Sequence, residues 1–219
     1  MQLQNENNAA AVSFYRIKSP AAAEFTEKKS RFIGQIFPAA DADEAGELIA
    51  EAKKKYWDAR HNVSAFIVGE DMPVERSTDD GEPAGTAGRP VLEVLRGANI
   101  RGAVLVVTRY FGGIKLGTGG LVRAYTRAAK MAIEEASLVP VASGVTYEVT
   151  LDYAAYGRLK SYFEEQGIVE RSSDFGQDVT LGLIVPKALD ESFTKALTDG
   201  SDGKVVYKQT GQGMYEFGS

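Results

Sequence analysis

The sequence predicts an α+β protein of two domains, and three observations lead to this fold class. The chain of 219 residues has no cysteine and is long enough to bury two small cores without disulfides. Strand patterns and amphipathic helix patterns alternate along it. A stretch with proline and glycine, Ser137–Gly144, separates a helical run from an alternating one. We therefore expect a flexible extension over residues 1–22, a first domain over 23–138 and a second over 145–210.

The first domain is expected to open with a strand region and a helix. Phe25–Phe37 has a strand pattern with a polar interruption at Glu27–Ser30, which fits either a hairpin turn or a bulge. Asp41 and Glu44 have the spacing of a helix capping box. The apolar positions that follow have helical spacing and predict one amphipathic helix: Ala45, Leu48, Ile49, Ala52 and Tyr56.

Two strands, a short helix and a central strand are expected next. Val63–Val68 has a strand pattern, and Val74–Ser77 has a weaker one. Pro90–Arg96 is expected to be a short helix, because proline suits a first turn and Gly97 suits a helix end. Gly102–Thr108 is almost entirely apolar, which is typical of a central strand covered on both faces.

The last helix of the first domain is expected to begin near Thr118 to Gly120 and to end near Glu135. At about 100° per residue, one face is small and apolar; it carries Leu121, Tyr125, Ala128, Ala132 and Ala136. The opposite face carries three cations, which are Arg123, Arg127 and Lys130. These cations form either an ordinary solvated surface or a contact surface for an anion.

The second domain is predicted to have the ferredoxin-like order βαββαβ. After an alternating strand at Val145–Leu151, Asp152 can cap a helix that Gly167 ends. A turn is expected at Asp174–Gly176. The remaining strands and helix are expected at Ile168–Ser172, Val179–Val185, Leu189–Leu197 and Lys204–Gln209. This order names no ligand, and the aromatic pattern of an RNA-recognition motif is missing.

The composition excludes several kinds of chemistry. With no cysteine and one histidine, His61, the chain offers neither a thiolate metal site nor a multi-histidine cage. Residues 1–11 lack the pattern of a secretory signal, and no stretch approaches the roughly 20 apolar residues of a membrane span. We expect a soluble, cytoplasmic protein with no membrane partner. The sequence does not indicate an oligomeric state.

Charge is unevenly distributed along the chain. The net charge is −5, and the deficit lies after residue 140. Within Gly85–Lys130, eight basic residues stand against one acidic residue, Glu93. The overall acidity argues against a protein that coats nucleic acid, whereas a confined basic surface can still bind phosphate or an acidic partner.

The first of two glycine-rich segments, residues 77–90, carries a carboxylate cluster. Asp79, Asp80 and Glu82 precede the helix expected at Pro90. Carboxylates this close stay ionised when a cation such as Mg²⁺, arginines or backbone amides share their charge. They therefore either order the loop and cap the helix or form a weak candidate metal site.

The second glycine-rich segment, residues 109–125, joins the central strand to the following helix. A strand, a glycine turn and a helix in this order expose consecutive backbone amides to an anion. The spacing is neither that of a Walker A motif nor that of a dinucleotide fingerprint, and glycines that let a helix approach a sheet give the same pattern. The candidate residues for binding an anion or a nucleic acid are Arg109, Gly112, Gly113, Lys115, Gly117, Thr118, Gly119, Gly120, Arg123 and Arg127.

No residue is assigned a catalytic role. His61 lies at a strand start, where a ring bonded to the backbone is more usual than a catalytic base. A Gly-x-Ser-x-Gly motif is missing, so a serine-hydrolase triad has no obvious nucleophile.

Three segments together resemble the IMPACT/YigZ family in order and spacing. They are Asp58–His61, Asp79–Pro90 and Arg109–Leu121. The βαββαβ tail resembles the small domain that bacterial members append, so the resemblance leaves out only the first twenty or so residues. The family motif corresponds to Arg60, His61, Asp79, Asp80, Gly81, Glu82, Pro83, Gly85, Thr86, Gly88, Tyr110 and Tyr125.

The resemblance implies the architecture and a link to translation. The first domain would be an α+β sandwich with the fold of the fourth domain of elongation factor G and of GHMP kinases, and the second would resemble the fifth domain of that factor. Eukaryotic relatives are regarded as regulators of translation, but they carry a different extra domain. Some bacterial relatives are called peptidases, and the sequence shows no metal-ligand set that supports this label.

We therefore expect a non-enzymatic protein without a cofactor, whose basic glycine-rich surface contacts RNA, the ribosome or a translation protein. One alternative is an enzyme or sensor of a phosphorylated small molecule or nucleotide, with Mg²⁺ held by Asp79, Asp80 and Glu82. A second alternative is a protein-interaction module that acts through the acidic second domain.

Overall fold

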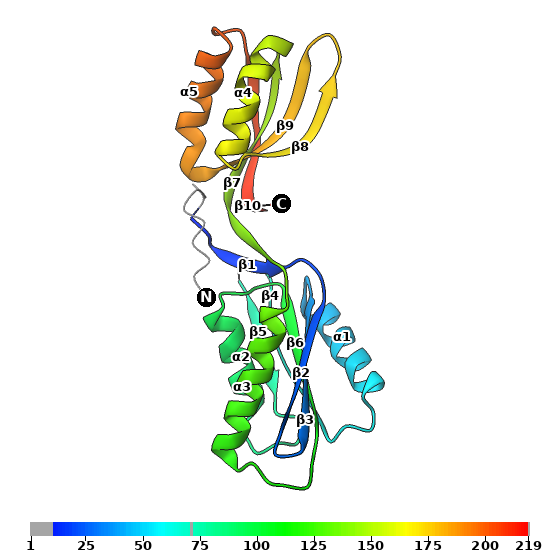
Figure 1. Ribbon diagram of the computed structural model, residues 1–219. Coiled ribbons are helices and arrows are strands. Elements are labelled where there is room, and N and C mark those ends of the chain that lie inside the picture. The colour runs from blue at the N-terminus through cyan, green and yellow to red at the C-terminus, as the bar shows by residue number, and fades with distance from the viewer. Residues whose placement is uncertain (1–10, 71, 219) are drawn as a thin grey trace. The chain divides into compact units, whose positions relative to one another are not determined.

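The computed structural model describes residues 11–70 and 72–218, and it contains two compact units (Figure 1). The first unit, called the first domain below, is Phe14–Val139. The second, called the second domain below, contains residues 11–13 and 140–218 of the described chain. The two-domain α+β architecture is as the sequence predicts.

The prediction of a flexible extension over residues 1–22 is wrong for the part that the structure describes. Residues 1–10 lie outside the described residues. β1 (Phe14–Ile17) and the start of β2 (Ala21–Glu27) are strands. The Tyr15 amide donates to the carbonyl of Asn99 at 2.8 Å, and the Arg101 amide donates to the carbonyl of Tyr15 at 2.9 Å. These backbone bonds order a segment whose apolar pattern is too short to predict a strand.

The first domain is a five-stranded antiparallel sheet with helices on both faces (Figure 1). The strand order is β2-β3-β6-β4-β5. The other strands are β3 (Ser30–Pro38), β4 (His61–Val68), β5 (Val74–Thr78) and β6 (Ala103–Tyr110). One face is covered by α1 (Ala42–Lys55), and the other by α2 (Gly88–Gly97) and α3 (Thr118–Glu134).

β6 is the central strand, as its apolar run predicts. Leu105 and Val107 pack in the core beneath α2 and α3, whereas Val104 and Val106 pack in the core beneath α1. Because both faces are covered, the strand carries apolar residues at successive positions instead of alternating with polar ones.

The polar interruption before β3 is a hairpin turn. β2 and β3 pair from Ala21 opposite Ile36 to Glu27 opposite Ser30, which leaves a two-residue loop. Both loop residues, Lys28 and Lys29, have positive φ angles, of 45° and 62°. Two-residue hairpins favour positive φ because it matches the twist of the strands, although glycine and asparagine are the usual residues there.

The starts of α1 and α2 are set by carboxylates that accept backbone amides. Asp41 accepts the amides of Asp43 and Glu44 at 3.0 and 2.9 Å, so the predicted cap of α1 is confirmed. α2 begins at Gly88, two residues before the predicted start. The Asp79 carboxylate explains this difference, because it accepts the amides of Ala87 and Gly88.

The two predicted faces of α3 are confirmed. The apolar positions Leu121, Tyr125, Ala128 and Ala132 are buried, and the cations on the opposite face are exposed. The glycine that allows close approach to the sheet lies on β3, because a Cβ at Gly34 would overlap the carbonyl oxygen of Ala128.

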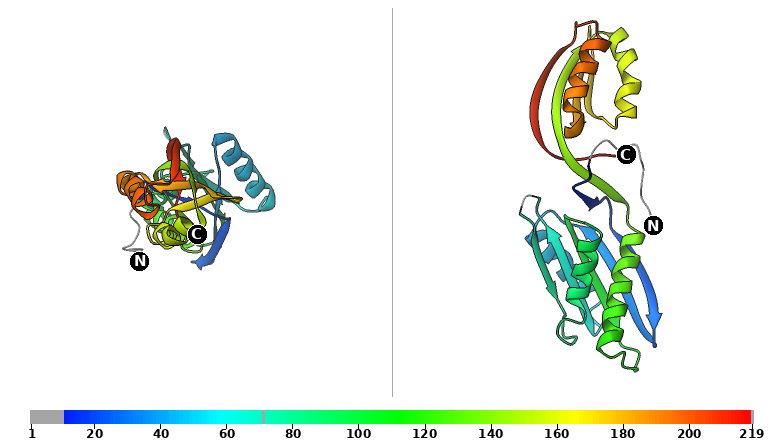
Figure 2. Two further views of the ribbon diagram at one scale, coloured as in Figure 1. Left: turned by 90° about the horizontal axis from the view of Figure 1, so that it is seen from above. Right: turned by 90° about the vertical axis from the view of Figure 1, so that its left-hand side faces the viewer.

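The second domain has the predicted βαββαβ order, with strand order β10-β7-β9-β8. Its strands are β7 (Leu138–Leu151), β8 (Val169–Phe175), β9 (Val179–Pro186) and β10 (Val206–Glu216). Its helices are α4 (Tyr153–Glu165) and α5 (Asp190–Gly200), preceded by a short 3₁₀ turn, Lys187–Leu189. Both helices cover the same face of the sheet over one apolar core (Figure 2).

The expected linker over residues 137–144 is strand in the structure. β7 begins at Leu138, and its residues Val141 to Gly144 pair with residues 216 to 213 of β10. The expected end of the last strand at Gln209 is therefore also too early. The two ends of the domain satisfy each other's backbone groups across the sheet, a long-range pairing that local sequence does not report.

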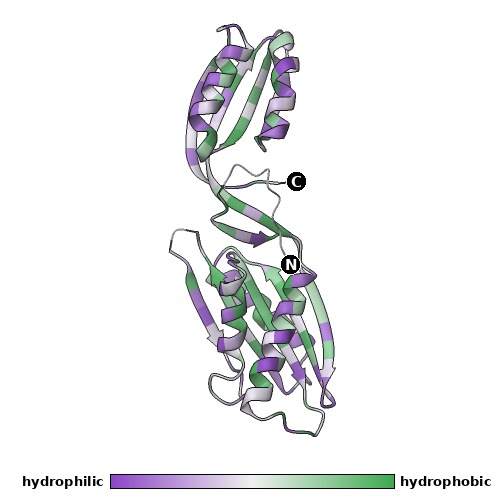
Figure 3. Cartoon of the chain, turned by 60° about the vertical axis from the view of Figure 1, so that its left-hand side comes forward, coloured by the Kyte–Doolittle hydropathy of each residue, from purple (hydrophilic) through white to green (hydrophobic). Residues whose placement is uncertain are grey.

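Hydropathy follows this architecture (Figure 3). The strands beneath the helices are mostly hydrophobic, and the outer faces of the helices are largely polar. None of the helices in residues 11–70 and 72–218 combines the length and the apolarity needed to cross a membrane.

Candidate anion-binding cleft

A cleft of about 440 Å³ in the first domain brings together the three sequence segments that carry the resemblance. Its wall contains Arg60 and His61 at the start of β4, Glu82 in the loop before α2, and Arg109 at the end of β6. Thr118 and the neighbouring loop residues complete it at the start of α3. Segments far apart in the chain thus form one site.

A buried charged cluster forms the floor of this cleft. The Arg109 guanidinium donates to Oε1 of Glu82 at 2.6 Å, and these two side chains are only 6% and 4% exposed. The Tyr125 hydroxyl donates to the same oxygen at 2.8 Å. Burial, followed by the neighbouring Glu82 charge, raises the pKa of Tyr125 well above its ordinary value, so Tyr125 acts as a neutral donor.

His61 has one ring nitrogen held and one without a hydrogen-bond partner. It lies opposite Arg109 in the pairing of β4 with β6. Nδ1 is 2.8 Å from the carbonyl oxygen of Asp80, which can only accept, so Nδ1 carries the proton. Nε2 is 3.8 Å from Oε1 of Glu82, beyond hydrogen-bond distance. In the neutral ring, Nε2 is therefore an acceptor at the cleft wall.

The three carboxylates of the first glycine-rich segment bind three different sets of partners. Asp79 accepts the backbone amides of Gly85, Ala87 and Gly88 at 2.8, 3.0 and 2.8 Å. Burial alone would raise the pKa of Asp79, but these bonds outweigh burial and hold the pKa below its ordinary value. Asp79 is thus the residue that orders the loop and caps α2.

Asp80 is held by the chain on both of its oxygens. It accepts Lys53 Nζ at 2.7 Å and the amide of Asn62 at 2.6 Å. Burial would raise the pKa of Asp80, and the Lys53 and Asn62 bonds lower it below its ordinary value. Among the described residues, no group of three or more acidic or histidine side chains is placed to hold a metal ion. The arrangement favours the loop-ordering interpretation over the metal interpretation.

The first turn of α3 presents backbone amides without acceptors. Leu121 is the first residue of this helix to donate to a carbonyl, that of Gly117, at 2.9 Å. Gly117 as N-cap provides no side chain, so the amides of Thr118, Gly119 and Gly120 have no partner among the described residues. This is the open-amide geometry that the sequence predicts, and it is favourable for a negative charge.

The glycines of this loop have different roles. A Cβ at Gly112 would overlap the backbone of Lys29, so Gly112 is needed for packing. Gly113 and Gly117 have positive φ angles, of 85° and 74°. Gly119 has neither constraint, since the nearest neighbour of a Cβ there would be Arg123 Nη1, at 3.6 Å. The Arg123 guanidinium therefore lies close to Gly119.

The predicted role of Arg109 in direct anion binding is wrong. Its guanidinium is buried between the rings of Phe32 and Phe111 and is neutralised by Glu82. Arg96 also pairs with acidic residues, Glu75 and Glu93. The surface charge is therefore smaller than the sequence window predicts. Six cations of the window have no carboxylate partner among the described residues: Arg89, Arg101, whose guanidinium donates to the backbone carbonyl of Glu70, Lys115, Arg123, Arg127 and Lys130.

The other residues of the family motif support the cleft. Gly81 and Pro83 line it beside Glu82, and Thr86 donates its hydroxyl hydrogen to the Pro83 carbonyl at 2.7 Å. Gly88 packs closely on β5, because a Cβ at this position would stand 2.7 Å from the backbone of Thr78. Tyr110 lies outside the lining and donates to Asp58 at 2.8 Å.

The sequence analysis missed two contributors to the site, Phe111 and Ser30, and it named Arg60 only as part of the family motif. Phe111 is 42% exposed at the cleft and lies under the Arg60 guanidinium at 5.9 Å. Ser30 accepts the Gly112 amide at 3.2 Å. Arg60 itself has no carboxylate partner among the described residues, so it adds a cation to the rim. An aromatic residue followed by two glycines in a basic loop was the available signal for Phe111.

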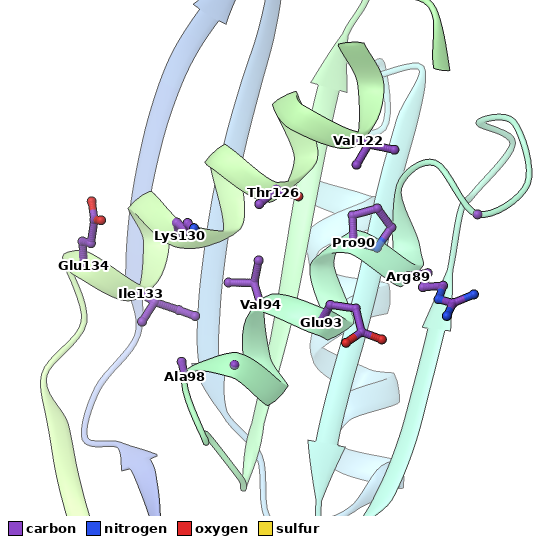
Figure 4. Close-up of a pocket in the computed structure, with 12 residues that line it drawn as sticks. Arg89, Pro90, Glu93, Val94, Ala98, Val122, Thr126, Lys130, Ile133 and Glu134 are labelled. Carbon is purple, nitrogen blue, oxygen red and sulfur yellow. The ribbon is translucent and has the colours of Figure 1, made fainter. Parts of the chain in front are cut away.

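A second cavity, a groove of about 710 Å³, lies between α2 and α3 (Figure 4). Pro90 and Val94 of α2 face Val122 and Thr126 of α3 across it. Its floor is largely apolar, and Lys130 lies farther along α3. Because none of the open amides lines this groove, it is separate from the anion-binding cleft.

Fold and site together define a class: a two-domain α+β protein with a ferredoxin-like second domain and a cationic, open-amide cleft in the first. The model of the Impact N-terminal domain matches residues 28–133, and that of a domain of unknown function, DUF1949, matches residues 149–204. The chain belongs to the IMPACT family.

Individual relatives match over most of their length. IMPACT family member YvyE of Bacillus subtilis (strain 168) is 34% identical over 197 residues, which are 90% of this chain and 91% of YvyE. IMPACT family member YigZ of Escherichia coli (strain K12) is 32% identical over 180 residues, 81% of this chain and 88% of YigZ. A crystal structure titled as that of a hypothetical protein aligns with a TM-score of 0.58 and 30% identity, covering 92% of this chain and 98% of that one.

Proposed function

We propose that the protein is a non-enzymatic RNA-binding protein that contacts RNA phosphates through a surface at the start of α3. We call this surface the α3 rim and define it as Arg60, Phe111, Lys115, Gly119 and Arg123. The observation that carries the proposal is the set of three unpartnered amides at Thr118–Gly120 beside these cations. Phosphate contacts from backbone amides, helix starts and basic side chains are general to nucleic-acid binding.

Two further features favour RNA over a small anion. Phe111 offers an exposed ring at the cleft, and bases of single strands stack on such rings. A third hollow, of about 220 Å³, is lined by three cations, Lys28, Arg123 and Arg127, and one acidic residue, Glu27, and it shares Leu116 with the cleft. Cations thus lie on both sides of the loop before α3, as a strand with several phosphates requires. The family resemblance favours an RNA that functions in translation.

Salt dependence of binding tests this proposal. We expect a fluorescently labelled single-stranded RNA of twelve nucleotides to bind the full chain, with an affinity that falls steeply between about 50 and 200 mM salt. In fluorescence anisotropy, Lys115→Ala and Arg123→Ala should each reduce the slope of log K against log salt by about 0.7. Lys195→Ala, which removes an exposed lysine of α5, is the matched control and should leave the slope unchanged.

Three results would contradict the proposal. Binding that is missing at low salt, or that does not change with salt, excludes phosphate contacts. Equal slope losses in Lys195→Ala and Lys115→Ala indicate general attraction instead of a local surface. Sedimentation with salt-washed ribosomes that is lost in Lys115→Ala, without binding of the free single-stranded RNA, would replace single-stranded RNA by a structured component of the ribosome as the ligand.

A further inference from the structure

Behind the α3 rim, the wall of the cleft presents hydrogen-bond acceptors instead of donors. Both donors to Glu82, Arg109 and Tyr125, use Oε1. Oε2 has no donor among the described residues, and it is not fully buried. Since Glu82 lines the cleft, Oε2 is an acceptor at the wall.

His61 adds a second acceptor beside the first. The residue is nine-tenths buried, its Nδ1 is bound to the Asp80 carbonyl, and its Nε2 has no hydrogen-bond partner among the described residues. Glu82 and His61 line the same cleft and lie within 3.8 Å of each other. Two neighbouring acceptors in a cleft wall are complementary to a ligand with two neighbouring donors.

The mouth of the cleft has the opposite requirement. Lys115 and Thr118 line it, and the open amides of α3 begin at Thr118. These groups favour a phosphate or another anion. Phe111, also at the cleft, offers a ring for an aromatic group. The cleft therefore fits a ligand with an anionic group, an aromatic group and, between them, adjacent hydroxyl groups.

We infer that the cleft is a ribonucleotide pocket that reads the ribose hydroxyls. The phosphate lies at the start of α3, the base stacks on Phe111, and the vicinal hydroxyls donate to Glu82 and His61. The cleft volume of about 440 Å³ is in the range of small-molecule sites. The phosphate half of this inference rests on the proposed function. The ribose half rests on the two acceptors.

This chemistry has two sources, a free mononucleotide and the 3′-terminal nucleotide of an RNA, because both carry free 2′ and 3′ hydroxyls. Isothermal titration calorimetry of the full chain with AMP and with 2′-deoxy-AMP measures the ribose contribution without altering the protein. We expect AMP to bind on the order of tenfold more tightly, because the deoxy compound leaves a buried acceptor without a donor. Equal affinities, or no binding of AMP at millimolar concentration, would overturn the inference.

A variant at His61 distinguishes binding in the ribonucleotide pocket from binding at the α3 rim. His61→Asn keeps an amide donor at the place of Nδ1 and removes Nε2, so the bond to Asp80 is retained. We expect the preference for AMP over 2′-deoxy-AMP to fall severalfold, while the salt slope for single-stranded DNA stays the same. Lys130→Ala, in the separate groove, should change neither quantity. An unchanged preference in a folded His61→Asn variant would exclude His61 as a reader of the ribose.

Oligonucleotides distinguish the two sources. If the 3′ end of an RNA is the ligand, a 3′-hydroxyl RNA binds several times more tightly than the same RNA with a 3′-phosphate. If AMP binds selectively and no oligonucleotide binds, the pocket stands with a free nucleotide as its ligand, and the proposed RNA function fails. If RNA and DNA of one sequence bind equally with the same salt slope, and AMP shows no preference over 2′-deoxy-AMP, the surface stands and the pocket fails.

Discussion

The two domains differ in the number of polar side chains that they bury. Among the described residues, the first domain buries nine polar or charged side chains, including the ion pair of Arg109 with Glu82, whereas the second buries two uncharged ones, Thr146 and Ser201. The core of the second domain is apolar throughout. Its polar cluster lies where the hydroxyl of the buried Tyr147 donates to Asp190, which also pairs with the exposed Lys187.

This difference indicates which domain carries the site. A buried ion pair is often no more stable than apolar residues of the same volume, because both charges lose their hydration. Stability alone therefore does not explain Glu82 and Arg109. A cluster of buried titratable groups beside a cleft is typical of functional sites. The second domain shows that a core of this protein can be built without buried charges.

The largest expected effect is that of breaking the buried pair. Glu82→Ala should lower the free energy of unfolding of the first domain by about 3–5 kcal/mol, because Arg109 is left buried without its partner. Asp190→Ala, at the edge of the second domain, should cost roughly 1 kcal/mol. Hydrogen exchange of peptides from β6 and β9 in urea measures each domain separately. Equal losses in the two variants would contradict the difference between the domains.

Acid should weaken the first domain more than the second. The folded pKa values of Asp79 and Asp80 lie below the ordinary value of 3.8, so both carboxylates stabilise the fold above about pH 4. This stabilisation is lost as the pH falls through their folded pKa values. The second domain has one such carboxylate, Asp190. Hydrogen exchange between pH 5 and pH 2.5 should therefore show earlier loss of protection in β4 and α2 than in β9.

A control variant tests whether Asp79 contributes to the acid sensitivity of the first domain. In Asp79→Asn, the side-chain oxygen can still accept an amide but carries no charge to lose, so the acid response of α2 should become shallower. An unchanged response in this variant would show that Asp79 does not contribute to the pH dependence.

The smallest expected effect is at the surface. Lys53 pairs with Asp80 and Lys187 with Asp190, both at 2.6–2.7 Å and with lysines that are 43% and 50% exposed. Lys53→Met and Lys187→Met should each change the stability of its own domain by about 0–1 kcal/mol, since water screens exposed pairs. Thermal unfolding at low and high salt checks this expectation. If Lys53→Met lowered the free energy of unfolding by more than about 2 kcal/mol, the contact of Lys53 with Asp80 would be part of the structure that supports the cleft and not an ordinary surface pair.

Local sequence patterns predicted the helices and strands but not which side chains pair with each other in the site. The helical periodicity of α3 and the unbroken apolar run of β6 were each sufficient to predict the element. The partner of Arg109 depends on strand register, which sets His61 opposite Arg109, and on the loop that brings Glu82 to them. Register is a property of two segments together, so neither segment alone reports it. For the same reason the charge of Arg109 was assigned to the surface, although the open amides at Thr118–Gly120 follow from local sequence.

The lysine turn between β2 and β3 has a consequence for how this domain assembles. Lys28 and Lys29 hold left-handed backbone conformations that side chains with a Cβ disfavour, so the turn by itself does not promote hairpin formation. The order of β2 comes from stacking of Phe25 on Phe32 and from the pairing of β3 with the distant β6. The hairpin therefore depends on contacts with the rest of the sheet for its stability, and its turn residues need not be the glycine or asparagine that a self-standing hairpin favours.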